Sequence, residues 1–203
     1  MADLKVIEED LIRLKVDPEK DNAKFNEKKG RKKKYPSQNY SNDKATYKVL
    51  NYCLDQGKMP EGAYRCYGAP NTADAEEVAA AFDCMRKFHG QDFGRQLNHF
   101  VISIKRHYVD ELEVAGLKEI TEAYVEPIAQ DHQLVYAIHE GVDKENNRVL
   151  HSHIVFNHVN YKTGLRHRRD NGFLDRELER LETIIEEVIE RKANDTTGGA
   201  FNE

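Results

Sequence analysis

The stretch HEGVDKENNRVLHSHIVFN, residues 139–157, decides the fold of this chain. It joins two segments rich in strand-forming residues, 134–140 and 148–159, through the short polar turn 141–147. Parallel strands need a connection of about a dozen or more residues, so a turn this short predicts an antiparallel hairpin.

The same stretch carries three histidines whose spacing brings them together. His151 and His153 are two positions apart on one predicted strand, so both side chains project from the same face. His139 ends the preceding strand. If the hairpin turns symmetrically near Glu145, His139 lies directly opposite His151 on that face.

Three converging imidazoles that leave open positions for water or a substrate oxygen are typical of a catalytic divalent metal site. Glu140 and Asp143 are candidates to bind the ion or to orient its ligands. A lone His-x-His pair is most often structural. The third histidine in hairpin register makes a metal site the favoured interpretation here.

Strands and helices alternate along the rest of the sequence. The pattern predicts an α+β protein with a mainly antiparallel central sheet covered by helices. Residues 3–16 fit either a strand pair or an amphipathic helix, and residues 62–70 read as irregular. The other predicted elements are a helix over 44–56, a helix over 73–88 capped by Asn71-Thr72, a strand over 98–105, a helix over 111–130 that Pro127 kinks or ends, and a final amphipathic helix from Leu174.

Composition divides the chain into three parts and argues against a membrane-spanning or a disulfide-rich protein. Residues 1–43 form an N-terminal extension with a basic arm, 44–192 the main domain, and 193–203 a flexible tail. No segment approaches the roughly 18 apolar residues of a membrane span, and three cysteines without a CxxC pair make a disulfide framework improbable. We therefore expect a soluble, cytoplasmic protein without membrane insertion.

The charge is unevenly distributed. The formal net charge of −5 argues against nonspecific coating of nucleic acid, yet KKGRKKK at 28–34 and RHRR at 166–169 are strongly basic. Such runs are often only solvated surface, but they also suit a basic groove on an acidic body. The candidate phosphate-binding residues are Arg31, Lys32, Lys33, Lys105, Arg106, Arg166, Arg168 and Arg169.

The histidine hairpin followed by Asn157 resembles the third motif of conjugative relaxases of the P-type mobilisation family. VLNYCLDQGKM at 49–59 resembles the first motif, and NHFVISIK at 98–105 resembles the second. The resemblance covers about residues 45–165 and includes the closing N-x-V-N-x-x-x-G pattern from Asn157. It departs from the family at Ser152, where a hydrophobic residue is usual, and in a longer acidic turn.

This resemblance implies a relaxase-type fold over 44–192 and a DNA-nicking activity. A tyrosine would attack one strand at an origin of transfer, giving a 5′-phosphotyrosyl link and starting mobilisation of a plasmid or transposon. It implies Tyr52 as nucleophile, Ser103 and Asn157 near the DNA, and Mn²⁺ or Mg²⁺ as cofactor. The implied partners are single-stranded DNA, an accessory DNA-binding protein and a type IV secretion coupling protein.

Three alternatives stay open at the level of sequence. In a rolling-circle replication initiator the tyrosine normally follows the histidines on a helix, whereas here only Tyr161 follows His153. A non-catalytic DNA-binding accessory protein, or a hydrolase using metal-activated water, would not need Tyr52. Tyr47, five residues earlier, is the main rival nucleophile.

Overall fold

The computed structural model describes residues 4–6, 12–16, 44–104 and 106–198. Within this part of the chain six strands form one sheet in the order β1-β2-β4-β6-β5-β3, and every neighbouring pair is antiparallel. The strands are β1 (Leu4–Val6), β2 (Ile12–Val16), β3 (Tyr64–Tyr67), β4 (Leu97–Ile104), β5 (Leu134–Val142) and β6 (Arg148–Asn157). The helices are α2 (Ala45–Cys53), α3 (Ala75–Phe88), α4 (Arg106–Ala129) and α5 (Phe173–Gly198).

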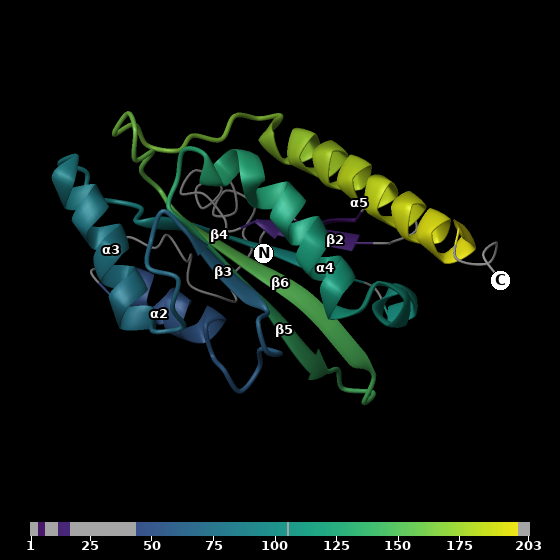
Figure 1. Cartoon of the computed structure of the whole chain (residues 1–203). Helices are drawn as coiled ribbons and strands as arrows, with labels where there is room; N and C mark the ends of the chain where they lie inside the picture. The colour runs from purple at the N-terminus through teal and green to yellow at the C-terminus, as the bar shows by residue number, and fades with distance from the viewer. Residues whose placement is uncertain (1–3, 7–11, 17–43, 105, 199–203) are drawn as a thin grey trace, which may run out of the picture.

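Helices cover both faces of the sheet, with α2 and α3 on one side and α4 and α5 on the other (Figure 1). Side chains of β6 alternate between two cores. Val155 packs with α2 and α3, while Ile154 and Phe156 pack with α4 and α5. The predicted α+β class with a helix-covered antiparallel sheet is confirmed.

The β5–β6 hairpin has the predicted register. His139 pairs directly with His151, as a turn centred on Glu145 requires. The Asp143 N–H donates to the Asn147 carbonyl (2.9 Å), and the Asp143 carboxylate accepts the N–H groups of Glu145 and Asn147. These bonds fix the turn and, through it, which residues share a sheet face.

The position of α2 is set at both of its ends. Arg86 of α3 is 2% exposed and donates to the Thr46 hydroxyl and the Gln96 carbonyl, which ties α2 to α3 and to the start of β4. After α2 the chain runs beside β5, where the Glu140 N–H donates to the Lys58 carbonyl (2.9 Å). The last turn of α2 is therefore held against the histidine hairpin.

Several local expectations are corrected. The segment 62–70 contains the short edge strand β3, whose four residues are too few for a readable alternation. Helix α3 is capped by Asp74, whose carboxylate accepts from Glu76 and Glu77, while the Asn71 amide oxygen accepts the Cys66 N–H instead.

Other differences concern the ends of helices. Helix α4 begins at Arg106 and is interrupted at Glu113 (φ 53°), whereas Pro127 lies in its last turn. Residues 4–6 and 12–16 adopt the strand-pair alternative. Helix α5 continues to Gly198, into the segment for which a flexible tail is predicted, and 199–203 lie outside the described residues. No helix of the described ranges is long and apolar enough to cross a membrane.

Candidate active site

His139, His151 and His153, called here the histidine triad, meet on the sheet face that α2 covers. Their ring centroids lie 4.5 to 5.3 Å apart, and one ring nitrogen from each falls within 4.8 Å of the others. Strand geometry explains the convergence, because two of the rings share a face of β6 and the third is opposite on β5. The structure thus brings together the three residues predicted as ligands.

Hydrogen bonds fix which nitrogens of the triad could bind an ion. His139 Nε2 lies 2.7 Å from the Cys53 carbonyl, which only accepts, so Nε2 carries the proton and Nδ1 offers a lone pair. His139 Nδ1 and His153 Nε2 are both buried and have no hydrogen-bond partner among the described residues. Buried nitrogens without a partner are costly unless something binds them. This donor set fits a divalent metal ion that accepts imidazole nitrogen.

The protein environment keeps the triad neutral. Burial, reinforced by the neighbouring imidazoles, lowers the pKa of His153 to about 2 and that of His151 to about 4. Burial also lowers the pKa of His139. Neutral imidazole is the form that binds metal, so the site is ready for an ion at neutral pH.

Tyr52 projects from the last turn of α2 over the triad. Its ring makes edge-on contacts with His153 (centroids 5.2 Å apart) and His139 (5.7 Å), yet the residue is 49% exposed. A phenol in contact with the triad and open to solvent is placed to meet a large substrate. Tyr47 is about 140° away around the helix axis, at about 100° per residue, and makes no ring contact with the triad within the described ranges.

Lys58 and Asp55 flank the tyrosine. The Lys58 ammonium lies 4.5 Å from the Tyr52 ring centroid and 2.8 Å from the Asp55 carboxylate. The hydrogen bond to Asp55 raises the pKa of Lys58, and the same bond lowers the pKa of Asp55. A fixed positive charge therefore stands beside the phenol, and neither residue was a sequence candidate.

Of the two neutral residues expected near DNA, only Ser103 lies at the site. It pairs with His151 across β4 and β6 and shares the triad's face. Asn157 is fully buried, and its amide donates to the Phe82 carbonyl (3.0 Å) and to Gln133 (2.9 Å). The DNA contact predicted for Asn157 is therefore replaced by a structural role in the core.

The two predicted carboxylates do not reach the triad. Glu140 follows His139 on the strand, so its side chain points to the opposite face, where it pairs with Arg148 (2.5 Å). Asp143 is engaged in the turn bonds described above. Asp55 is the acidic group whose charge acts on His139, from a turn that sequence spacing does not relate to the hairpin.

The basic candidates divide into structural residues and exposed ones. Arg166 donates to the carbonyls of Phe93 and Arg95, both at 2.7 Å, and fastens a loop. Arg169 donates to Asn98 and lies over the Phe100 ring, on the sheet face away from the triad. Arg168 is exposed and makes no hydrogen bond or ion pair with the described residues. The candidates outside the described residues or side chains are Arg31, Lys32, Lys33, Lys105 and Arg106.

His99 and Cys53 are site residues that the sequence analysis missed. His99 Nε2 is 2.9 Å from His153 Nδ1 and 3.9 Å from Cys53 Sγ. His99 lies within the predicted strand NHFVISIK, four residues before Ser103 and therefore on the same face of that strand. This spacing was the signal in the sequence that could have placed His99 at the site. Cys53 is 1% exposed, and burial raises the pKa of its thiol.

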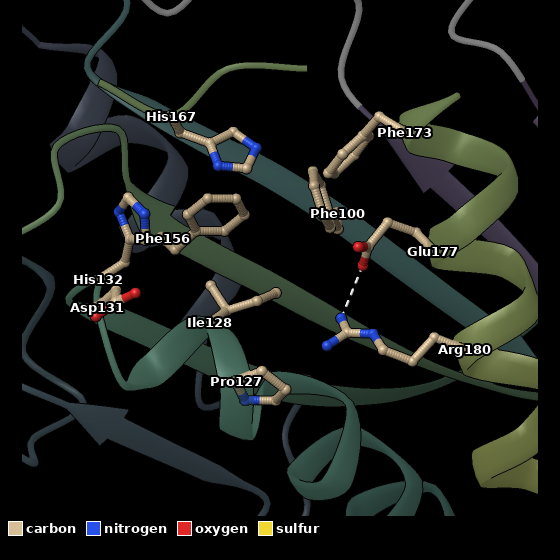
Figure 2. Close-up of a pocket in the computed structure, with 10 residues that line it drawn as sticks. All are labelled: Phe100, Pro127, Ile128, Asp131, His132, Phe156, His167, Phe173, Glu177 and Arg180. Atoms are coloured by element: carbon tan, nitrogen blue, oxygen red, sulfur yellow. Dashed lines mark hydrogen bonds and ion pairs between the residues drawn. The ribbon is translucent and has the colours of Figure 1, made fainter. Parts of the chain in front are cut away.

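A cavity of about 250 Å³ lies on the other face of the sheet (Figure 2). Phe100 and Phe156 in its wall alternate with the residues that face the triad, and Glu177 and Arg180 at its side are bonded to each other at 2.7 Å. It is therefore separate from the tyrosine and the triad. Its lining comprises Phe100, Pro127, Ile128, Asp131, His132, Phe156, His167, Phe173, Glu177 and Arg180.

The fold and the site define a protein whose exposed tyrosine stands over three neutral histidines on an antiparallel sheet. Comparison with known proteins assigns it: residues 52–193 match the family described as "Relaxase: MobA/VirD2-like, nuclease domain". The chain belongs to this relaxase family, whose nuclease domain implies a DNA endonuclease activity and binding of single-stranded DNA. No curated protein and no solved structure matched it.

Proposed function

We propose that this protein nicks and rejoins one DNA strand at an origin of transfer by metal-dependent transesterification through Tyr52. The observation that carries the proposal is the contact of the exposed Tyr52 ring with two histidines of the triad. The biological role would be the start of conjugative mobilisation of a plasmid or transposon. Its setting would be the cytoplasm, with an accessory DNA-binding protein and a type IV secretion coupling protein as partners.

In the proposed reaction the Tyr52 oxygen forms a bond to the scissile phosphorus, and the bond from phosphorus to the 3′ oxygen breaks. The phenol proton passes to water, and the 3′ oxygen takes up a proton as it leaves. The products are a 5′-phosphotyrosyl link and a free 3′-hydroxyl. Since one ester replaces another, the reverse reaction can rejoin the strand.

A phenol with an ordinary pKa of about 10 is a weak nucleophile at neutral pH, so the site must assist it. The nearby Lys58 ammonium would attract the phosphate and favour the phenolate through its charge. Ser103 is close enough in the sheet to help orient the DNA backbone. Arg168, which is exposed and has no partner among the described residues, is available for a phosphate contact.

The triad would hold the divalent ion through His139 Nδ1, His153 Nε2 and a nitrogen of His151. Such an ion would supply positive charge that polarises the phosphate and offsets charge developing in the transition state. Imidazole ligands add no negative charge, so the ion keeps its full charge for this purpose. We propose Mn²⁺ or Mg²⁺; the all-nitrogen donor set suits Mn²⁺ better.

The test mixes the full chain with Mn²⁺ and single-stranded oligonucleotides from the flanks of its own gene. An SDS-resistant protein–DNA adduct, mapped by peptide mass to Tyr52, is the expected result. Tyr47→Phe is the matched control, because both tyrosines lie on α2 and are similarly exposed, at 42% and 49%. Tyr52→Phe should lose cleavage and adduct together, and Tyr47→Phe should keep both. Intact bound DNA, or turnover that survives Tyr52→Phe, would refute the proposal.

A further inference from the structure

A second group of metal-binding side chains lies beside the triad and shares one residue with it. Cys53, His99 and His153, called here the cysteine–histidine cluster, each offer one ligand atom, and these atoms lie within 4.8 Å of one another. Cys53 ends α2, His99 lies on β4 and His153 on β6. Three separate elements thus converge on one point next to Tyr52.

The distances in this cluster suit a small tetrahedral ion. With Zn–S of about 2.3 Å and Zn–N of about 2.0 to 2.1 Å, tetrahedral angles separate sulfur from nitrogen by about 3.6 Å and two nitrogens by about 3.3 Å. Cys53 Sγ lies 3.9 Å from His99 Nε2, which lies 2.9 Å from His153 Nδ1. Both separations are therefore within about 0.4 Å of the tetrahedral values.

The chemistry of the donors differs between the two groups. The triad offers nitrogen alone, whereas the cysteine–histidine cluster adds a sulfur, and thiolate selects soft ions such as Zn²⁺ over Mg²⁺ or Mn²⁺. We propose that Cys53, His99 and His153 form a binding site for a soft metal ion, and that an ion bound there excludes the ion of the triad. This exclusion follows from the residue that the two groups share.

His153 cannot serve both sites as a neutral imidazole. The triad uses its Nε2, a buried atom with no partner in the described part of the chain, and then Nδ1 keeps the proton and donates to His99. The cysteine–histidine cluster uses Nδ1, so the ring proton must move to Nε2. On binding, the soft ion also replaces the thiol proton of Cys53, which passes to water. Holding both ions at once would require removal of the single N–H proton of the ring, which would turn His153 into an imidazolate anion.

If the proposed function is correct, a soft ion at this cluster switches nicking off by emptying the triad. The binding itself does not depend on that function, so it is tested separately. The probe is Co²⁺ added to the full chain, because a bound thiolate gives cobalt a charge-transfer absorption that nitrogen ligands do not give. Cys66→Ala is the control for a buried cysteine and Cys84→Ala for an exposed one.

Wild type, Cys66→Ala and Cys84→Ala should show the thiolate absorption, and Cys53→Ala should lose it while its circular dichroism stays native. Cys53→Ala keeps a small apolar side chain at this buried position, and His99→Gln, whose residue is only partly buried, provides a second variant that should also lose the band. A wild type without the band, or a band that persists in folded Cys53→Ala, would overturn the site whether or not the protein nicks DNA.

Exclusion is measured on Mn²⁺ by paramagnetic resonance. Adding Cd²⁺ should release Mn²⁺ from the wild type, and Cys53→Ala should need at least roughly tenfold more Cd²⁺ for the same release. Loss of a residue that only hydrogen-bonds to a metal ligand already weakens metal affinity by about tenfold or more, so loss of a ligand should have at least this effect. Equal release from both proteins would overturn the exclusion while leaving the cobalt result to decide the site.

Discussion

His151→Ala is the substitution that tests the triad most directly. The other two members are held by further contacts, His139 to the Cys53 carbonyl and His153 to His99. His151 is only half-buried and makes no hydrogen bond with the described residues beyond the β6 backbone. Its truncation therefore removes a candidate ligand while disturbing little else.

The size of the effect follows from linkage. An ion that binds only the folded chain stabilises it by about 2.7 kcal/mol at a concentration one hundred times its Kd. For a domain of 150 to 250 residues, each kcal/mol raises Tm by about 2 to 4 °C, so saturating Mn²⁺ should raise the wild-type Tm by about 5 to 11 °C. With a ligand lost, His151→Ala should show at most a small part of this shift.

The assay is thermal unfolding followed by circular dichroism, with and without Mn²⁺. His89→Ala is the matched control: this histidine is also half-buried, and its Nε2 contacts the Tyr161 carbonyl (3.0 Å) rather than the triad. It should retain the full Mn²⁺ shift. An equal shift in His151→Ala, or no shift in wild type, would show that the triad does not bind the ion.

Three further predictions concern stability and rate. Burial holds the pKa of His153 far below the unfolded value of about 6.5, so below pH 6.5 the unfolded chain binds more protons than the folded chain. The free energy of unfolding should therefore fall with pH, by up to about 1.4 kcal/mol per pH unit for this residue. Urea titrations at pH 7.5 and pH 5 measure this fall, and equal stability at the two pH values would contradict the prediction. Arg86→Met should lower the free energy of unfolding by about 1 to 3 kcal/mol in the same urea titration, because it leaves buried acceptors unpaired. The control Arg65→Met, at an exposed pair with Glu122, should change the free energy of unfolding by no more than about 0.5 kcal/mol. Lys58→Gln should slow adduct formation about two- to fivefold, which corresponds to the interaction energy of an exposed cation with an aromatic ring. The control Lys162→Gln should leave the rate unchanged, although it removes a similar arrangement of Lys162 with Asp131 and Tyr161.

The histidine hairpin was predictable from sequence because the centre of a short turn fixes which residues of the two strands are paired. A turn of known centre and a strand period of two determine that His139 and His151 are opposite and that His153 shares their face. The same alternation places Glu140 on the other face. Strand alternation therefore keeps the Glu140 carboxylate away from the triad, although Glu140 is next to His139 in the sequence.

Contacts between distant segments were not predictable in the same way. Asp55 and Lys58 reach the site because the turn after α2 hydrogen-bonds to the backbone of β5, a pairing that no local pattern encodes. Asn157 has the polarity of a DNA-binding residue but serves the core, because its amide donates to the carbonyl of Phe82 in α3, the helix packed on this face of the sheet. The resemblance implies a place near the DNA for Asn157, whereas the structure gives its amide partners within the core.

The histidine triad and the nucleophile belong to different structural elements, so metal binding and adduct formation should respond differently to damage in each element. The ring positions of the triad depend mainly on the β5–β6 hairpin, whose turn and register are local, and His139 has a further hydrogen bond to α2, at the Cys53 carbonyl. Metal binding should therefore be less sensitive to damage outside the hairpin than the position of the nucleophile is. The nucleophile depends on α2, which Arg86 fastens to α3 and to β4. Loosening that attachment should therefore impair adduct formation more than Mn²⁺ affinity, since Tyr52 would lose its position over histidines that stay in place.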